Sequence, residues 1–106
     1  MAHDQPKDIY QSEHCAELLK ALAEPLRLRI VEALRERPRN VGEIADALGV
    51  EVVIASHHLG ILRNVGLVER QKQGRFAVYS LRPGLSTQGH IDLGCCELRL
   101  PNDDRR

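Results

Sequence analysis

The chain has 106 residues, and its 15 Lys and Arg balance its 15 Asp and Glu to a formal net charge of zero. This length provides one domain with a single modest core, and the zero net charge argues against a strongly basic nucleic-acid binder. Only 3% of the residues are aromatic, so aliphatic helix packing must supply most of the buried surface. No apolar run approaches the roughly 18 residues of a membrane span. The first residues, MAHDQPKD, do not read as a signal peptide.

The cysteine content bears on the redox compartment. The chain has three cysteines, Cys15, Cys95 and Cys96, and no recognisable export signal. Disulfide frameworks belong to oxidising compartments, so we expect reduced thiols in a cytoplasmic protein that has no membrane partner.

The charge is unevenly distributed along the chain. Residues 24–75 hold nine Arg and Lys against seven Asp and Glu, whereas residues 1–23 hold two against four. Arg70, Lys72 and Arg75 cluster with no acidic residue between them. This local cluster can contact phosphates although the whole chain is neutral.

In chain order, the first elements are expected to be two helices. Residues 1–8 are polar and contain a proline, so we expect a flexible N-terminus. A helix is predicted from about Ile9 to Ala23, and a second helix begins at Pro25, which suits a first helical turn. Pro38 ends this second helix. The residues predicted to face inward are Cys15, Leu18, Leu19 and Leu22 in the first helix and Leu26, Ile30, Ala33 and Leu34 in the second.

A pair of short amphipathic helices is predicted between Asn40 and Val68. Asn40 and Glu43 have the spacing of a capping box, and Gly49 marks a tight turn. The apolar positions recur with helical period, and Gly66 stops the second helix. The predicted buried residues are Ile44, Ala45, Leu48, Ala55, Leu59 and Leu62. Such a pair with a glycine-containing turn is typical of a helix-turn-helix.

Beyond Gly66 the apolar pattern changes to a period of two, which predicts strands. Residues 67–71 and 75–81 flank a Lys72-Gln73-Gly74 turn, and Gly74 supplies a positive φ at the tip of a β-hairpin. The predicted fold is mainly α with a β-hairpin: a winged helix-turn-helix, with a three-helix core plus wing, over residues 9–82.

The last segment, residues 83–106, is predicted to be a strand-like extension that serves dimerisation or sensing. A helix here would carry Gly89 and Gly94 in its interior, each costing about 1 kcal/mol relative to Ala. Residues 90–95 alternate as in a strand, and the alternation then reverses. This reversal predicts a bulge or bend near residues 94–96.

Four motifs carry a resemblance to a known family. They are ALAEPLRLRIVEAL, GEIADALGV, ASHHLGILRNVGLV and GRFAVYSL, and together they cover about residues 16–82. These segments resemble the ArsR/SmtB family of bacterial transcriptional repressors. The resemblance implies a homodimer that binds double-stranded operator DNA and is released when an inducer binds. It also implies that the recognition helix enters the major groove while the wing reaches the neighbouring minor groove or backbone.

The resemblance assigns DNA-contacting roles to individual residues. The expected contacts are Ser56 and His57 in the recognition helix, Arg63 at its end, and Gln71, Lys72, Gln73 and Arg75 at the wing tip. His58 aligns with a buried histidine of the family and is predicted to be a satisfied core residue. The chain departs from the family at residues 51–54, where Glu51 would repel phosphates. The valines and isoleucine that follow Glu51 offer only apolar contacts, such as with a thymine methyl group.

The family also suggests an inducer site. The family's cysteine pair would align with Asn40 and Gly42, so that thiol site is absent, and the C-terminal zinc pattern is not reproduced. The remaining candidates are Cys15, Cys95 and Cys96, which could bind As(III) or another thiophilic metal ion as inducer. Redox or persulfide sensing and plain packing stay open as alternatives. Neighbouring side chains in a strand point to opposite faces, so both vicinal sulfurs reach one ion only if the strand is distorted.

The sequence also bears on two other classes of function, a protein-interaction module and an enzyme. A winged-helix protein-interaction module is the alternative, because the predicted recognition helix begins with the apolar residues Val52-Val53-Ile54 and the net charge is neutral. An enzyme is not expected. No set of acid, base and nucleophile appears at readable spacing.

Overall fold

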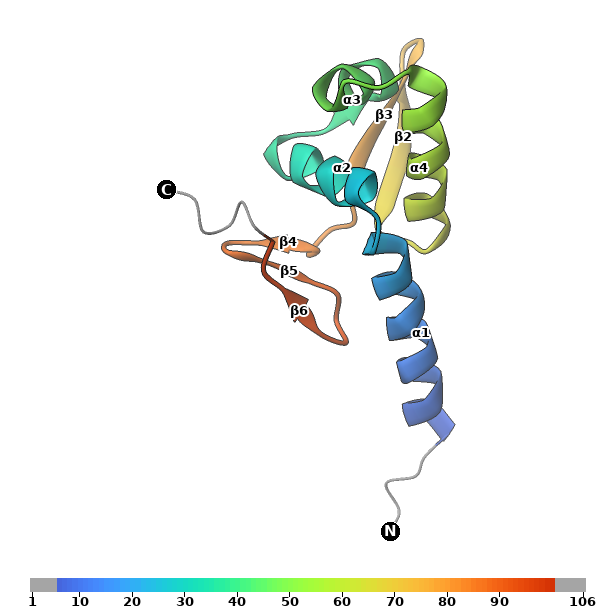
Figure 1. Cartoon of the computed structure of the whole chain (residues 1–106), viewed down its shortest axis with the longest axis vertical. Helices are drawn as coiled ribbons and strands as arrows, with labels where there is room; N and C mark the ends of the chain where they lie inside the picture. The colour runs from blue at the N-terminus through green and yellow to red at the C-terminus, as the bar shows by residue number, and fades with distance from the viewer. Residues whose placement is uncertain (1–5, 101–106) are drawn as a thin grey trace.

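The structure, a computed structural model, describes the backbone of residues 6–100 and the side chains of residues 11–100. Figure 1 shows helices and strands in the order α1 (Pro6–Leu22), α2 (Pro25–Glu36), β1 (Arg39–Asn40), α3 (Val41–Leu48), α4 (Val52–Asn64), β2 (Val68–Gln73), β3 (Phe76–Leu81), β4 (Ser86–Thr87), β5 (His90–Asp92) and β6 (Glu97–Leu98). The helices precede the strands almost throughout, as the change of sequence period predicts.

The two N-terminal helices are separated at Glu24-Pro25, as predicted. Helix α1 begins at Pro6, three residues before the predicted start at Ile9, because proline is well accommodated in a first helical turn. Residues 1–5 of the predicted flexible N-terminus lie outside the described residues. Pro25 opens α2, and Glu24 caps this helix by accepting hydrogen bonds from the backbone N–H groups of Leu26 and Arg27 at 2.7 and 3.0 Å.

The helix-turn-helix follows its predicted local signals closely. The Asn40 side chain accepts from the Glu43 N–H at 2.9 Å, and the Glu43 carboxylate accepts from the Asn40 N–H at 3.0 Å, which completes the capping box. Gly49 ends α3 in the left-handed region with φ 71°. The predicted inward residues Ile44, Ala45, Leu48, Ala55, Leu59 and Leu62 are all buried.

The wing is part of a three-stranded antiparallel sheet in the order β1-β3-β2. Gln73 pairs with Phe76, so the turn consists of Gly74 and Arg75, one residue later than the predicted Lys72–Gly74 turn. Gly74 has φ 63°, as a glycine at the first turn position permits. Strand β1 was not predicted, because two residues carry no periodicity and their partners Val78 and Tyr79 lie far along the chain.

The C-terminal extension is strand-like, as predicted, and forms a second antiparallel sheet in the order β4-β5-β6. Ile91 pairs with Leu98 and Asp92 with Glu97, so residues 93–96 are the turn of a hairpin. The Leu93 N–H donates to the Cys96 carbonyl at 2.9 Å across this turn. The reversal of the apolar alternation therefore comes from a chain reversal, the bend of the prediction, and not from a bulge within one strand.

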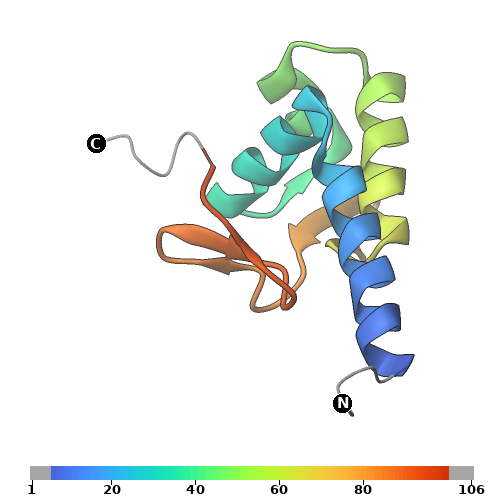
Figure 2. The same ribbon diagram turned by 60° about the horizontal axis from the view of Figure 1, so that its bottom comes forward.

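One core joins both sheets to the helices. The fully buried large side chains include Leu18, Ile30, Val31, Ile44, Leu59, Leu62, Leu67, Val68, Leu85 and Ile91. Leu19 was predicted to face inward but is 39% exposed, because Leu18 and Leu22 already fill the inward stripe of α1. Arg35 of α2 holds the second sheet by donating to the Ser86 hydroxyl and the Thr87 carbonyl, both at 3.1 Å. Figure 2 shows this sheet beside α2 and α1 beside α4.

No single described helix is long and apolar enough to cross a membrane. Helices α3 and α4 satisfy length and composition only when taken together, and they are bent by 109° at their junction.

Candidate nucleic-acid interface

Helix α4 has a buried face and an exposed face. Ala55, Leu59 and Leu62 are fully buried and fix the helix against the core. The opposite face exposes Ser56, His57 and Arg63, the three residues of this helix expected to contact DNA. These polar side chains are therefore exposed to solvent and accessible to a partner.

Gly60 lies on the same exposed face, one helical turn from both Ser56 and Arg63. A Cβ built at this position would meet no atom within 4 Å, so packing inside the chain does not require a glycine. Glycine in a helix interior is destabilising by roughly 0.5–1 kcal/mol relative to alanine. A glycine that weakens the helix without an internal packing reason is typical of a place where another backbone approaches closely.

The wing supplies the remaining predicted contacts. Only Val68 of β2 is buried, and the rest of this strand is exposed. Gln71, Lys72 and Gln73 are exposed along β2, and Arg75 is exposed in the turn. Figure 1 shows the wing tip and the N-terminal end of α4 at the same end of the molecule, opposite α1 and the second sheet. The structure therefore brings the wing tip and the N-terminal part of α4, which carries Ser56 and His57, to one end, whereas Arg63 lies in the last turn of the helix.

An apolar patch lies at this end too. Val52, Val53 and Ile54 at the start of α4 are 50%, 69% and 41% exposed, and Phe76 beside the wing turn is 58% exposed. The first three stand out in the sequence, whereas the exposure of Phe76 was not predicted. Its place directly after the turn was the available signal.

His58 was expected to be a satisfied core residue, and it is satisfied but only half-buried. Arg27 Nη1 lies 3.1 Å from His58 Nδ1. Arginine can only donate, so the Arg27 guanidinium is the donor in this contact. The same guanidinium donates through Nε to the Ala21 carbonyl at the end of α1. Arg27 thus joins α1 to α4, a role without any local sequence signal.

His58 also touches the predicted DNA-contacting face. Its ring packs edge-to-face against the ring of His57, with centroids 5.1 Å apart. The contacts therefore continue from the end of α1, through Arg27 and His58, to His57.

Glu24 has a shifted pKa. Desolvation is the largest single influence on the pKa of this carboxyl and raises it. The hydrogen bonds from the backbone N–H groups of Arg27 and Leu26, together with the charges of His58 and Arg27, outweigh that effect. The net result is a pKa below the ordinary value of 4.5. The α2 cap is therefore ionised at neutral pH.

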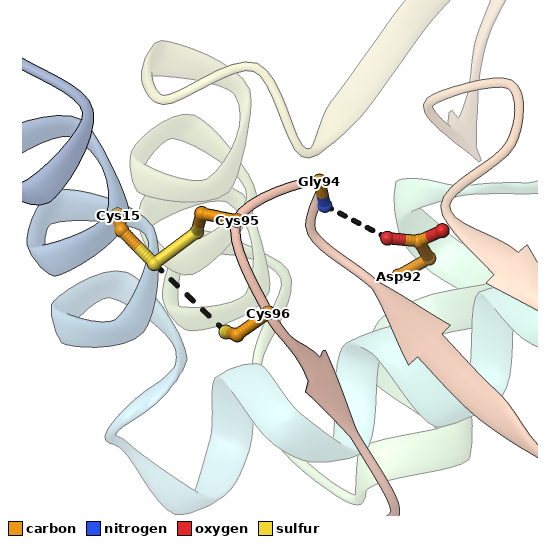
Figure 3. The surroundings of a disulfide bond; sticks show 5 residues. All are labelled: Cys15, Asp92, Gly94, Cys95 and Cys96. Carbon is orange, nitrogen blue, oxygen red and sulfur yellow. Dashed lines mark hydrogen bonds between the residues drawn. A yellow bond between two sulfur atoms is a disulfide. The ribbon is translucent and has the colours of Figure 1, made fainter. Parts of the chain in front are cut away.

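The three cysteines form a cluster between α1 and the β5–β6 turn (Figure 3). Cys15 of α1 and Cys95 of the β5–β6 turn form a disulfide across 80 residues of sequence. The prediction of three reduced thiols is therefore wrong for this pair. Composition addresses the cellular compartment, and it contains no information on which sulfurs the fold brings together.

Cys96 is a free thiol and lies within reach of the disulfide. Its Sγ is 3.9 Å from the Cys15 Sγ. The vicinal side chains point toward the same helix because Cys95 and Cys96 lie in a turn and not in a strand. Gly94 enters this turn with φ 88°, and its N–H donates to the Asp92 carboxylate at 2.8 Å.

A second group of metal-binding side chains lies on the C-terminal sheet. One ligand atom from each of His90, Asp92 and Glu97 lies within 4.8 Å of the others. The Thr87 hydroxyl already lies 2.9 Å from His90 Nε2. These are nitrogen and oxygen ligands, which differ in chemical class from the sulfur ligands of the cysteine cluster.

The arrangement of α2, α3, α4 and the β2–β3 hairpin defines a winged helix-turn-helix. The family described as bacterial regulatory protein, arsR family, matches residues 24–70. Transcriptional repressor SdpR of Bacillus subtilis is 31% identical over 64 residues, which are 60% of this chain and 71% of that protein. The chain belongs to the arsR family of bacterial regulatory proteins.

Other relatives support this assignment. HTH-type transcriptional regulator NmtR of Mycobacterium tuberculosis is 45% identical over 76 residues, which are 72% of this chain and 63% of that protein. The homodimeric winged helix-turn-helix DNA-binding domain Mb0332 of Mycobacterium bovis superposes with a TM-score of 0.70 at 33% identity, covering 76% of this chain and 75% of that one. The chain thus spans less than two thirds of the length of NmtR.

Proposed function

We propose that this protein is a transcriptional repressor that binds operator DNA as a homodimer. In this proposal α4 enters the major groove and the β2–β3 wing lies against the neighbouring backbone or minor groove. The observation that carries the proposal is the exposure of the α4 polar face and of the cationic wing tip at one end of the molecule. In this proposal the protein acts in the cytoplasm, where the chromosomal DNA of a bacterium lies.

Ser56 and His57 are proposed to read bases. Hydroxyl and imidazole groups can donate to and accept from base edges in the major groove, where each base pair presents a distinct pattern. The edge-to-face contact with His58 restricts the orientation of the His57 ring. A restricted side chain loses less rotamer entropy when it forms a contact.

Arg63, Lys72 and Arg75 are proposed to contact phosphates, with Gln71 and Gln73 adding neutral hydrogen bonds at the wing. Phosphate contacts fix the register of a protein on DNA without reading its sequence. Three cations in each protomer make six phosphate contacts in a dimer. The logarithm of affinity should then fall against the logarithm of salt concentration with a slope of about −5.

The apolar start of α4 is proposed to contact thymine methyl groups. Val52, Val53 and Ile54 are exposed at the end of the helix that lies beside the wing tip. Apolar side chains distinguish thymine from other bases through its methyl group in the major groove. A dimer with these residues favours A·T pairs where the two helices begin.

Dimerisation is supported by the M. bovis domain, which is homodimeric. Leu19 on α1 is 39% exposed and supplies an apolar contact for a second copy. A two-fold dimer repeats the recognition helix and predicts an operator with two related half-sites.

Substitution of individual contacts tests the proposal. Ser56→Ala and His57→Ala should weaken binding to the protein's own promoter DNA by about tenfold each and leave binding to unrelated DNA unchanged. Arg75→Ala should weaken both. If the first two variants bound promoter DNA as tightly as the wild type, the assignment of base readout to α4 would be wrong.

A protein-interaction module remains the competing function, because the exposed valines could dock on a protein partner. Val53→Asp would then abolish partner capture while Arg75→Ala left it untouched. Our proposal predicts that Arg75→Ala impairs DNA binding, an effect that a protein-docking surface around Val53 does not produce.

A further inference from the structure

The guanidinium of Arg27 lies where α1, α2 and α4 meet. Its Nε donates to the Ala21 carbonyl in the last turn of α1, and its Nη1 lies 3.1 Å from Nδ1 of His58 in α4. The backbone N–H of Arg27 donates to the Glu24 carboxylate at 3.0 Å, which holds this residue in the first turn of α2. One half-buried residue therefore links three helices.

The sequence explains why the Ala21 carbonyl takes a side-chain donor. In a continuous helix this carbonyl would accept from the backbone N–H four residues later. That residue is Pro25, which has no N–H. Carbonyls at a helix end need other partners, and the negative end of the helix dipole favours a cation. Arg27 meets both requirements and is thereby anchored to the end of α1.

The same anchor sets the direction from which Arg27 reaches α4. A guanidinium is planar and presents its N–H groups in a fixed fork, so the bond from Nε constrains where Nη1 points. Beside the guanidinium, α1 and α4 leave an open pocket between them, and their apolar side chains do not fill this space. The pocket is lined by Glu17, Lys20, Ala21, Arg27, Ile61 and Val65. The two bonds of Arg27 therefore form a polar link between α1 and α4 at this level.

The link continues to a side chain that is proposed to read DNA. A hydrogen bond at Nδ1 restricts the broad second torsion of the His58 side chain. The His58 ring packs against the exposed ring of His57, with centroids 5.1 Å apart and ring planes at 67°. A rotation of the His58 ring therefore changes the surface against which the His57 imidazole rests.

We propose that Arg27 is a positioning residue for base readout. It fixes the His58 ring, and this ring holds the His57 imidazole in the orientation that meets the base. The inference rests on the proposed function, which assigns base readout to His57. Arg27 acts through His58 and not through a contact of its own with DNA. Specificity at the base that His57 reads therefore depends on a side chain outside the recognition helix.

The first arm of the test measures DNA binding by the full chain. Arg27→Met keeps a long apolar side chain in α2 and removes every donor of the guanidinium. Affinity for promoter DNA should fall by about tenfold, as for the loss of one base contact, while affinity for unrelated DNA of equal length stays unchanged. Arg29→Met makes the same change at an exposed position of α2 and should bind both DNAs as the wild type does. Arg27→Gln, which can donate along one direction only, serves as a second variant if Arg27→Met does not fold.

A double variant separates positioning from a general loss of structure. If Arg27 acts through His57, Arg27→Met combined with His57→Ala should bind promoter DNA no more weakly than His57→Ala alone. A general loss of structure would instead multiply the two decreases in affinity. Multiplied decreases would therefore contradict the positioning role.

The second arm needs no DNA. NMR of the full chain with isotopically labelled histidine, at about pH 8 and thus above the ordinary histidine pKa of about 6.5, reports the ring nitrogens of His57 and His58. In the wild type Nδ1 of His58 should be the unprotonated nitrogen, because it accepts from Arg27. In Arg27→Met the His58 nitrogens should move toward the average of two exchanging tautomers, and the ring protons of His57 should shift. Arg29→Met should leave both rings unchanged.

The outcomes distinguish this inference from the proposed function. Equal promoter affinity in Arg27→Met and Arg29→Met, or an unshifted His57 ring in Arg27→Met, would overturn the inference. If His57→Ala weakens promoter binding and Arg27→Met does not, the positioning role is wrong and base readout by His57 stands. If Arg27→Met shifts the His57 ring while His57→Ala leaves promoter affinity unchanged, the assignment of readout to His57 is wrong and the positioning role falls with it.

Discussion

The two ends of this molecule are built in different ways. The end formed by α3, α4 and the wing rests on contacts between residues close in sequence, such as the Asn40–Glu43 capping box and the Gln73–Phe76 turn. The cysteine end rests on a disulfide across 80 residues. Local contacts survive changes elsewhere, whereas a long-range crosslink can be made or removed by redox chemistry. The first end therefore keeps its contacts whatever the redox state, whereas the second end changes with it.

The largest expected effect is on stability at the cysteine end. Reduction of the Cys15–Cys95 disulfide should lower the free energy of unfolding by about 2–4 kcal/mol, because the crosslink closes a long loop in the unfolded chain. Urea unfolding with and without a phosphine measures the difference. Cys96→Ser keeps the disulfide and serves as the control. Equal stability of the oxidised and reduced chains would remove the contrast between the two ends.

Charge removal at the wing should affect affinity and not stability. The double variant Lys72→Ala with Arg75→Ala removes four phosphate contacts from a dimer, so DNA affinity at low salt should fall by about 100-fold and the salt slope by about 4. Lys20→Ala on α1 removes one exposed cation far from the wing tip and should leave the slope unchanged. An unchanged slope in the double variant contradicts the assignment of the wing.

The capping box should matter for stability at the recognition end. Asn40→Ala removes the side-chain acceptor for the Glu43 N–H and should cost about 1 kcal/mol. Thermal denaturation should show a decrease in Tm of about 4–8 °C. Asn64→Ala, an exposed position at the end of α4 with no capping role, should change the free energy of unfolding by less than about 0.5 kcal/mol.

Gly60→Ala separates folding from recognition in a single variant. The added methyl group meets nothing inside the chain, so the helix should be stabilised by about 0.5–1 kcal/mol. If DNA approaches this face closely, affinity should decrease in the same protein. Higher stability with undiminished affinity would show that the backbone at Gly60 does not approach DNA.

The smallest effect is pH-dependent and concerns Glu24. Its pKa is lowered in the folded protein, so its stabilising contribution is present above about pH 4.5 and is lost as the pH falls through the folded pKa. Glu24→Gln should therefore have a lower Tm than the wild type at neutral pH, and the difference should shrink on acidification. A difference that grows toward low pH would reverse the sign of this linkage.

Features that rest on residues close in sequence could be predicted, and features that join distant segments could not. The capping box, the Gly49 turn and the buried stripe of Ala55, Leu59 and Leu62 depend on spacing within a few residues, so they could be predicted. The exposure of Ser56 and His57 followed from that stripe. The strand-like C-terminal segment could also be predicted from its glycines and alternation.

The remaining features depend on residues that only the fold brings together. The pairing of β1 with β3, the Arg27 bridge to His58 and the Cys15–Cys95 disulfide each join segments more than 30 residues apart. Arg27 and His58 meet only in the folded chain, so no local pattern contains their contact. The prediction of reduced thiols failed for the same reason.

The central claim is that α4 and the wing bind operator DNA, and a salt titration of binding tests it most directly. Fluorescence anisotropy of promoter DNA and of unrelated DNA of equal length, titrated with the wild-type chain at several salt concentrations, measures both affinities. We predict at least about 1,000-fold tighter binding to promoter DNA and a slope of about −5 in the logarithm of affinity against the logarithm of salt concentration. No binding to promoter DNA even at low salt would contradict the claim.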